Sequence, residues 1–242
     1  MMRLAVLASG RGSNLQAILR SISAGRLAAR VALVLSNVPD APALGLAEAA
    51  GIPTWAKDHR TFASRREFDL AMLEAMAAAK VEAVALAGYM RLLSPAFLHA
   101  YPQRILNIHP SLLPAFTGAD GAGDTLACGA KFAGCTVHFV EEAVDAGPII
   151  IQAALAIRGN ETLESLMPRI HALEHRIYPQ ALHWLATGKL RPRGRIVQLP
   201  PAEYGEAAPL VGALAGTLPG SLSGGMPLPD GCLVSPPLEP GF

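Results

Sequence analysis

The 242-residue chain has few charged residues, which make up 16% of it, and its formal net charge is only +1. No run of Lys and Arg forms a basic stripe, which argues against nucleic acid as a main partner. Hydrophobic residues make up 51% of the chain, which is ample material for a core. The length suits one large domain, or one domain with an appendage.

Cysteine is also scarce. The three cysteines, Cys128, Cys135 and Cys232, are odd in number and do not have the spacing of a metal site. Reduced thiols in a cytoplasmic protein are the simplest interpretation, because disulfides form mainly in oxidising compartments. No cluster of potential ligands is seen in the sequence, so we expect no metal.

Long hydrophobic runs are missing as well. The chain opens directly into a strand-like segment, without the features of a signal peptide. The longest uncharged stretch, 207–229, is interrupted by prolines and glycines, whereas a membrane helix needs about 20 mainly apolar residues. Lys and Arg do not occur after Arg195, and Gly and Pro recur through the tail. We therefore expect a cytoplasmic protein without a membrane segment, whose tail, 201–242, is poorly ordered.

Short apolar runs alternate with helical patterns through residues 1–200. The runs at 3–8, 31–35, 83–87 and 105–108 have the character of buried strands. Such strands, separated by helices, predict a mostly parallel sheet with helices on both faces, a Rossmann-like α/β fold. Two further strands are joined by a tight turn, and they predict one antiparallel pair in the C-terminal half.

A polar, glycine-rich turn follows the first strand and leads into a helix, in the segment Ser9-Gly10-Arg11-Gly12-Ser13-Asn14. Free backbone N–H groups and the helix dipole favour a phosphate at such a turn. Gly12, Ser13 and Asn14 are therefore candidate phosphate-binding residues. A dinucleotide fingerprint would need a third glycine and an acidic residue after the next strand; both are missing, so NAD and FAD are disfavoured. A plain turn before a capped helix is the structural alternative.

Asn107 and His109 lie two residues apart where a predicted strand ends. Residues i and i+2 of a strand point to the same face, so both side chains can face one substrate. Pro110 restrains His109 to an extended backbone. A buried Asn and a loop His are the structural alternative, and this stretch alone does not decide between them. His138, in a later strand, is expected to be structural or supporting, and Asp145 alone is typical of turn chemistry.

Another candidate segment, 88–95, lies at the carboxyl end of the strand at 83–87. Open α/β sheets bind ligands at this edge. The apolar side chains of the segment can line a pocket with Arg91 at its rim. Core packing around a helix start, with Ser94 as N-cap and Pro95 after it, is an equally open alternative.

Five segments of the chain resemble the phosphoribosylglycinamide formyltransferases, over residues 2 to about 200. They are residues 9–16, 87–94, 107–114, 136–140 with 145–149, and 174–175 with 178–179. The Asn-x-His pair with a downstream Asp is typical of the wider group of formyltetrahydrofolate-dependent formyltransferases. The Gly-Ser-Asn-Leu-Gln turn points to the member of that group that acts in purine biosynthesis, whose small substrate is phosphorylated.

The resemblance implies a formyltransferase fold and the transfer of a formyl group from 10-formyltetrahydrofolate to the amine of glycinamide ribonucleotide. In that reaction the Asn107 amide would donate to an oxyanion, His109 would transfer a proton, and Asp145 would hold the imidazole. Both substrates are small molecules, and the protein could be a monomer or a homodimer.

The resemblance also assigns binding residues. The ribonucleotide phosphate and ribose would be held by Gly12, Ser13, Asn14 and Glu174. The folate would be bound by Arg65, Met90, Arg91, Leu92, Leu93, Asn107, Val140 and Asp145. It further implies a formyltransferase domain over 1–200, with a nucleotide-binding half at about 1–103 and a folate-binding, catalytic half at about 104–200.

One segment departs from the family pattern. Ala122 stands where the family places a His, and the glycines at 121 and 123 would weaken a helix there. A catalytically impaired folate- or nucleotide-binding relative therefore remains an alternative, as does a formyltetrahydrofolate hydrolase with the same Asn, His and Asp. The hydrolase usually has an extra N-terminal domain, for which this chain has no room. A methionyl-tRNA formyltransferase would add a basic C-terminal domain, which the tail without Lys or Arg disfavours.

Overall fold

The computed structural model describes residues 1–200 and 232–242. The first half contains β1 (Met2–Leu7), α1 (Ser13–Ser23), β2 (Ala29–Ser36), α2 (Pro42–Ala49), β3 (Thr54–Ala56), the 3-10 turn η1 (His59–Thr61), α3 (Arg65–Ala78), β4 (Ala83–Leu86), α4 (Pro95–Ala100) and β5 (Ile105–His109). The second half contains α5 (Gly121–Ala127), β6 (Phe132–Phe139), β7 (Ile149–Ala156), α6 (Leu163–Ala186), β8 (Arg191–Arg193), β9 (Ile196–Gln198) and β10 (Leu233–Ser235).

The described strands form one mixed sheet in the order β3-β2-β1-β4-β5-β6-β7-β9-β8, and β10 also pairs with β7. Strands β1 to β5 pair in parallel among themselves, as do β7 and β9. The pairs β5–β6, β6–β7, β8–β9 and β7–β10 are antiparallel. The predicted mostly parallel α/β sheet is confirmed, and its antiparallel part is larger than the one pair expected.

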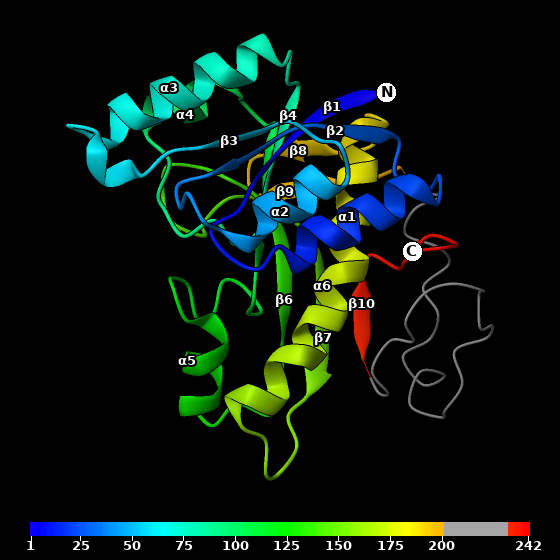
Figure 1. Cartoon of the computed structure of the whole chain (residues 1–242). Helices are drawn as coiled ribbons and strands as arrows, with labels where there is room; N and C mark the ends of the chain where they lie inside the picture. Colours follow the sequence, from blue (N-terminus) through cyan, green and yellow to red (C-terminus); the bar gives the residue numbers. More distant parts are fainter. Residues whose placement is uncertain (201–231) are drawn as a thin grey trace.

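Two hydrophobic clusters cover the two faces of the sheet. In β5, Leu106 and Ile108 belong to the larger cluster, whereas Ile105 belongs to the smaller one. The larger cluster includes residues of α1, α2 and α6, and the smaller one residues of α3 and α4; Figure 1 shows these two groups of helices in separate places around the strands. Since strand side chains alternate, Asn107 and His109 follow Ile105 to the α3/α4 side.

Helix α6 is tied to the strands that carry the candidate site. The Tyr178 hydroxyl oxygen lies 2.9 Å from the carbonyl oxygens of both Leu86 and Leu106. It therefore bridges β4 and β5 close to the ends from which the candidate loops begin.

The expectation of a poorly ordered tail is wrong for its last part. Residues 232–242 include β10, which pairs with residues 152–154 of β7 (Figure 1). They then contact α6, where the Gln180 side chain donates to the Pro237 carbonyl and accepts from the Glu239 N–H. Composition could not reveal these contacts, because the partners are distant in the sequence. Residues 201–231 lie outside the described part of the chain.

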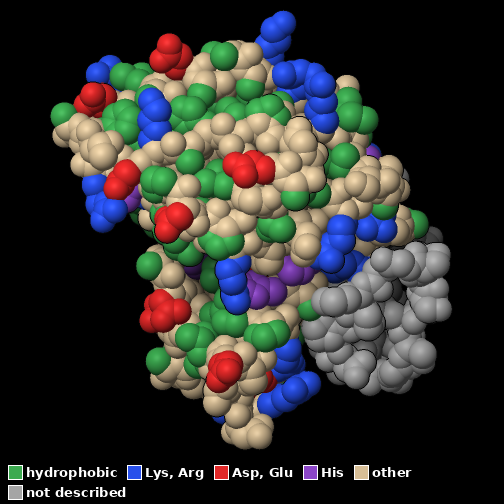
Figure 2. All heavy atoms as spheres, in the orientation of Figure 1, with side chains coloured by type: hydrophobic (Ala, Val, Ile, Leu, Met, Phe, Trp, Pro, Cys, Tyr) green, Lys and Arg blue, Asp and Glu red, His purple; other side chains and the backbone are tan. Residues whose placement is uncertain are grey.

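Charged side chains of both signs are interspersed on the face shown in Figure 2, without one continuous basic stripe on that face. None of the helices in residues 1–200 and 232–242 is long and apolar enough to cross a membrane.

Candidate active site

A cavity of about 710 Å³ lies beyond the carboxyl ends of β4 and β5. Small-ligand sites typically have volumes of about 300–1,000 Å³. Its position follows the rule that open α/β sheets bind ligands at the carboxyl ends of their strands. All the residues that the resemblance assigned to folate line it: Arg65, Met90, Arg91, Leu92, Leu93, Asn107, Val140 and Asp145.

His109 is buried at the end of β5, and both of its ring nitrogens face acceptors. Nε2 lies 2.9 Å from the Phe116 carbonyl oxygen, and Nδ1 lies 3.5 Å from Asp145 Oδ2. A carbonyl oxygen only accepts, so Nε2 carries a proton. A ring with protons on both nitrogens could donate to both acceptors, whereas a neutral ring could donate to one.

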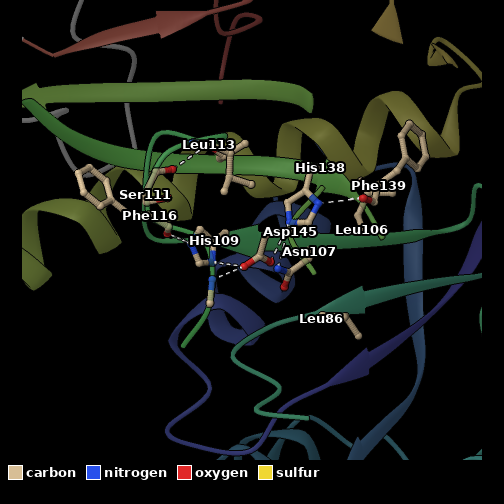
Figure 3. A network of polar contacts seen from close by, with 12 residues as sticks. Leu86, Leu106, Asn107, His109, Ser111, Leu113, Phe116, His138, Phe139 and Asp145 are labelled. Carbon is tan, nitrogen blue, oxygen red and sulfur yellow. Dashed lines mark hydrogen bonds and ion pairs between the residues drawn. The ribbon is translucent and has the colours of Figure 1, made fainter. Parts of the chain in front are cut away.

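Asp145 reaches this ring from the turn between β6 and β7. Its φ of 51° is left-handed, a conformation that Asp tolerates better than most residues. One carboxylate oxygen accepts the Gly118 N–H at 2.8 Å, and the other lies 3.7 Å from His138 Nε2. Figure 3 shows the carboxylate between the two histidine rings. A residue that alone suggested only turn chemistry therefore lies within the candidate site.

Asn107 and His138 face each other across the β5–β6 pair. His138 Nδ1 lies 2.8 Å from the Phe139 carbonyl oxygen, so this nitrogen carries the proton, and burial lowers the pKa of the ring. The unprotonated Nε2 can then accept from Asn107 Nδ2, which is 3.2 Å away. An amide nitrogen has two N–H groups, so Asn107 retains one for a ligand. His138, expected to be structural or supporting, thus orients the Asn107 amide.

Two backbone groups of the loop after β5 also belong to the cluster, and sequence reasoning missed them. They are the Phe116 carbonyl beside His109 and the Gly118 N–H beside Asp145. Phe116 and Gly118 have φ angles of 55° and 101°. Only the glycine offered a sequence signal, because it is the residue that adopts positive φ without strain.

The β1–α1 turn has the geometry of an anion site. Gly12 is the N-cap residue of α1 with a φ of 80°, and a Cβ there would lie 2.9 Å from Ala43 Cβ. Both backbone and packing therefore require glycine. Ser13 and Asn14 are the first two residues of α1, where backbone N–H groups lack partners within the helix and attract anions.

Glu174 reaches the same turn from α6. Its Oε2 accepts from Asn14 Nδ2 at 2.8 Å, and both side chains are buried. Burial raises the pKa of Glu174 to about 7, although the Asn14 hydrogen bond opposes the shift. Asn14 Oδ1 is buried without a hydrogen-bond partner among the described residues. The predicted phosphate and ribose residues are therefore neighbours, although they come from opposite ends of the domain.

Further cationic or ionisable groups lie near this turn, and the sequence analysis assigned no role to them. On α6, the rings of His171 and His175 stack with their centroids 6.2 Å apart. Burial lowers the pKa of both rings, that of His175 to about 4, and the charge of Arg11 lowers that of His171 further. Figure 2 shows histidine side chains over α1 and α6 with basic side chains beside them. The i,i+4 spacing on a helix was the available signal.

The segment that departs from the family pattern forms α5. Asp120 caps this helix, because its carboxylate accepts the Gly123 N–H at 3.1 Å. Gly121 lies against His109, since a Cβ there would come within 2.7 Å of His109 Nε2. Ala122 is buried in the larger core cluster. The glycines expected only to weaken the helix thus allow close packing beside the candidate site.

Within residues 1–200 and 232–242, no group of three or more His, Cys, Asp or Glu residues has the arrangement to hold a metal ion.

Residues 2–182 match the formyl transferase family. Phosphoribosylglycinamide formyltransferase of Bacillus subtilis (strain 168) is 44% identical over 185 residues, which are 76% of this chain and 95% of that protein. The trifunctional purine biosynthetic protein adenosine-3 of Drosophila melanogaster is 46% identical over 188 residues, which are 77% of this chain but only 14% of that longer protein.

Solved structures agree with this match. Glycinamide ribonucleotide transformylase 1 from Symbiobacterium toebii has a TM-score of 0.81 at 50% identity, covering 82% of this chain and 94% of that one. Phosphoribosylglycinamide formyltransferase from Coxiella burnetii has a TM-score of 0.77 at 43% identity, covering 82% and 93%. Because both the family match and these relatives cover about three quarters of the sequence, the chain belongs to the formyl transferase family.

Proposed function

We propose that the protein transfers the formyl group of 10-formyltetrahydrofolate to the amine of glycinamide ribonucleotide, a step of de novo purine biosynthesis. The observation that carries the proposal is the placement of Asn107, His109 and Asp145 together at the edge of one cavity. The names of the relatives in Bacillus and Symbiobacterium support the choice of the ribonucleotide as acceptor.

The three residues divide the chemistry. When the amine attacks the formyl carbon, negative charge develops on the formyl oxygen, and the remaining Asn107 N–H is suited to donate to it. Removing one such preorganised donor typically costs about 3–4 kcal/mol of transition-state stabilisation. The amine must lose a proton, and the folate nitrogen must gain one as it leaves. His109 is suited to this transfer, with Asp145 as the counter-charge.

Both ring nitrogens of His109 already face acceptors, so a substrate that exchanges a proton with the ring must take the place of one of these acceptors. The 3.5 Å separation between Nδ1 and Asp145 is longer than the 2.9 Å contact between Nε2 and Phe116. Catalytic hydrogen bonds are often long before substrate binds. The Asp145 side of the ring is therefore the one that we expect to rearrange.

Binding roles follow from position. We assign the phosphate to the start of α1 at Gly12, Ser13 and Asn14, and the ribose hydroxyls to Glu174, whose carboxylate can accept from hydroxyl groups. The folate would occupy the largely apolar cavity, which draws residues from both sides of position 103. The domain over 1–200 would thus bind two small molecules, and the thiols of Cys128 and Cys135 suit a reducing cytoplasm.

A formyl-transfer assay tests the proposal. The full chain is mixed with glycinamide ribonucleotide and a 10-formyl folate analogue, and the deformylated folate is followed by its absorbance. Turnover that requires the amine substrate is the expected result. Formate release without the amine would identify a hydrolase instead. Binding of both ligands without turnover would identify a catalytically impaired relative.

A further inference from the structure

A buried carboxylate that takes no part in the proposed chemistry lies behind the cavity wall. Asp69, on α3, is 0% exposed, and burial raises its pKa. Its Oδ2 accepts the Ser94 backbone N–H at 2.6 Å, whereas Oδ1 has no hydrogen-bond partner among the described residues. Burying a carboxylate with incomplete hydrogen bonding is costly, so its presence at this position requires a reason.

The hydrogen bond to Ser94 connects Asp69 to the cavity. Ser94 is the N-cap residue of α4, and within the described chain its own side chain makes no capping hydrogen bond. Leu93 and Pro95, on either side of it, both line the cavity. The wall formed by residues 88–95 is therefore tied to α3 by this backbone hydrogen bond, in addition to the contact between the Tyr89 hydroxyl and Met72 Sδ at 3.7 Å.

Two arginines of the same wall experience the charge of Asp69. Arg65 and Arg91 both line the cavity, and their charges lower the pKa of Asp69 against the effect of burial. The Arg91 guanidinium lies 4.9 Å from the ring centre of Phe68, the residue before Asp69. Arg65 precedes Asp69 by four residues on α3, which places both on one helix face. Arg91 thus packs against α3 at the residue next to Asp69, and Arg65 lies one helical turn before Asp69.

We propose that Asp69 is a positioning residue for the formyl donor, because its carboxylate holds the 88–95 wall, and Arg91 with it, at the cavity through the Ser94 N–H. This inference rests on the proposed function for the identity of the ligand. The ribonucleotide residues belong to α1 and α6, which pack against the other face of the sheet. Loss of the Asp69 charge should therefore weaken folate binding and leave ribonucleotide binding unchanged.

The test uses the full chain with Asp69→Asn, Arg91→Ala and both changes together. Calorimetry measures the Kd of the 10-formyl folate analogue, and the transfer assay measures kcat and the KM of the ribonucleotide. Asp69→Asn should raise the folate Kd about tenfold. The double variant should bind folate about as weakly as Arg91→Ala alone, because the two residues act together. In Asp69→Asn, the ribonucleotide KM should stay within about twofold of the parent value.

Ser94 supplies a matched pair of variants that leave Asp69 in place. Ser94→Ala keeps the N–H and should bind folate more tightly than the proline variant. Ser94→Pro removes the N–H, and the φ of −75° at this position suits proline. It should raise the folate Kd, which keeps the proposal testable if Asp69→Asn does not fold.

Two results would overturn the proposal. One is a parent-like folate Kd in both Asp69→Asn and Ser94→Pro. The other is an equal loss of affinity for both substrates together with a lower melting temperature, which would give Asp69 only a structural role. If the parent protein binds the folate analogue but shows no turnover, the proposed function fails and the proposal for Asp69 does not. The comparison of Kd values between variants does not need turnover.

Discussion

The proposed catalytic edge and the two proposed binding regions beside it satisfy their buried polar groups differently. At the edge, defined here as Asn107, His109, His138 and Asp145, each side chain contacts another member or a loop backbone group. In the proposed binding regions, the α1 turn and the 88–95 wall with Asp69 behind it, the buried atoms Asn14 Oδ1, Ser94 Oγ and Asp69 Oδ1 have no hydrogen-bond partners among the described residues.

The hydrogen-bonded side chains of the edge are fixed in position for the reaction, whereas the unpartnered atoms of the binding regions lower the stability of the folded protein. A preorganised donor does not need to reorient during the reaction, which is the main advantage of an enzyme over water. A buried polar atom without a partner costs about 1–3 kcal/mol. Proteins retain such costs where function needs them. We therefore expect activity and stability to fall together at the edge and to change independently in the binding regions.

The largest effect is expected at the edge. His109→Ala should lower kcat about 10³-fold, since general acid–base groups contribute roughly 10²–10⁴-fold. It should also lower the melting temperature, because the Phe116 carbonyl loses its partner. His99→Ala is the control, since the His99 side chain is 77% exposed, and its rate should match the parent. A loss of less than tenfold in His109→Ala would contradict the role of the edge.

At Glu174, we expect a substitution to raise stability while it weakens ligand binding, unlike at His109, where activity and stability should both fall. Its folded-state pKa of about 7 lies above the usual 4.5, so the folded protein holds a proton that the unfolded chain releases between these values. The corresponding stability is present below pH 4.5 and is lost as the pH rises through 7, by roughly 3 kcal/mol in total. Glu174→Gln should therefore be more stable than the parent at pH 8, while it binds the ribonucleotide more weakly.

Urea denaturation from pH 5 to 8 measures this difference. The free energy of unfolding of the parent should fall with rising pH relative to that of Glu174→Gln. Both curves also contain the opposite contribution of His138, His171 and His175, whose lowered pKa values favour the folded state as the pH rises. Glu164→Gln, at an exposed position of the same helix, should follow the parent. Parallel curves for Glu174→Gln and the parent would show that Glu174 does not titrate in this range.

A substitution in α5 tests whether position 122 belongs to the edge or only to the core. Because Ala122 is buried in the core cluster, Ala122→His should destabilise the protein by about 1–3 kcal/mol through overpacking, without raising kcat. Denaturation and the transfer assay measure both effects. A large gain in rate would instead mean that the His expected there belongs in the site and that this chain is impaired without it.

The smallest effect is expected on the wall. Leu92 is 56% exposed and lines the cavity, so Leu92→Ala should weaken folate binding by about 1 kcal/mol, roughly fivefold, with kcat unchanged. Leu163→Ala, which changes a leucine 41% exposed on α6, is the matched control and should bind normally. If Leu92→Ala lowered kcat more than it lowered folate affinity, the wall would affect the reaction step as the edge does, which would contradict the comparison.

Local patterns predicted the parts of the site that lie close together in the sequence. Asn107 and His109 could be paired because a strand places alternate residues on one face. Gly12 could be recognised because a strand, a glycine-rich turn and a helix start form an anion site by local geometry alone. Asp145 and Glu174 entered through the family resemblance, since a turn Asp and a helical Glu are ordinary on their own.

Groups that act through distant contacts could not be predicted in this way. The Phe116 carbonyl carries no side-chain signal, and the function of Asp69 depends on a backbone N–H 25 residues away. Composition suggested disorder for residues 232–242, but a strand can form wherever a sheet edge supplies hydrogen-bond partners, and β7 supplies them here.

By itself, the amino-acid sequence determined the α/β alternation, the glycine at the α1 turn and the pairing of an amide with an imidazole on one strand. These follow from backbone sterics and side-chain periodicity, which act over a few residues. Tertiary structure alone decided which carboxylate faces His109, that Ala122 lies in the core, and that Asp69 supports the cavity wall. These depend on the burial of charges and on hydrogen bonds between segments that meet only when the sheet is assembled.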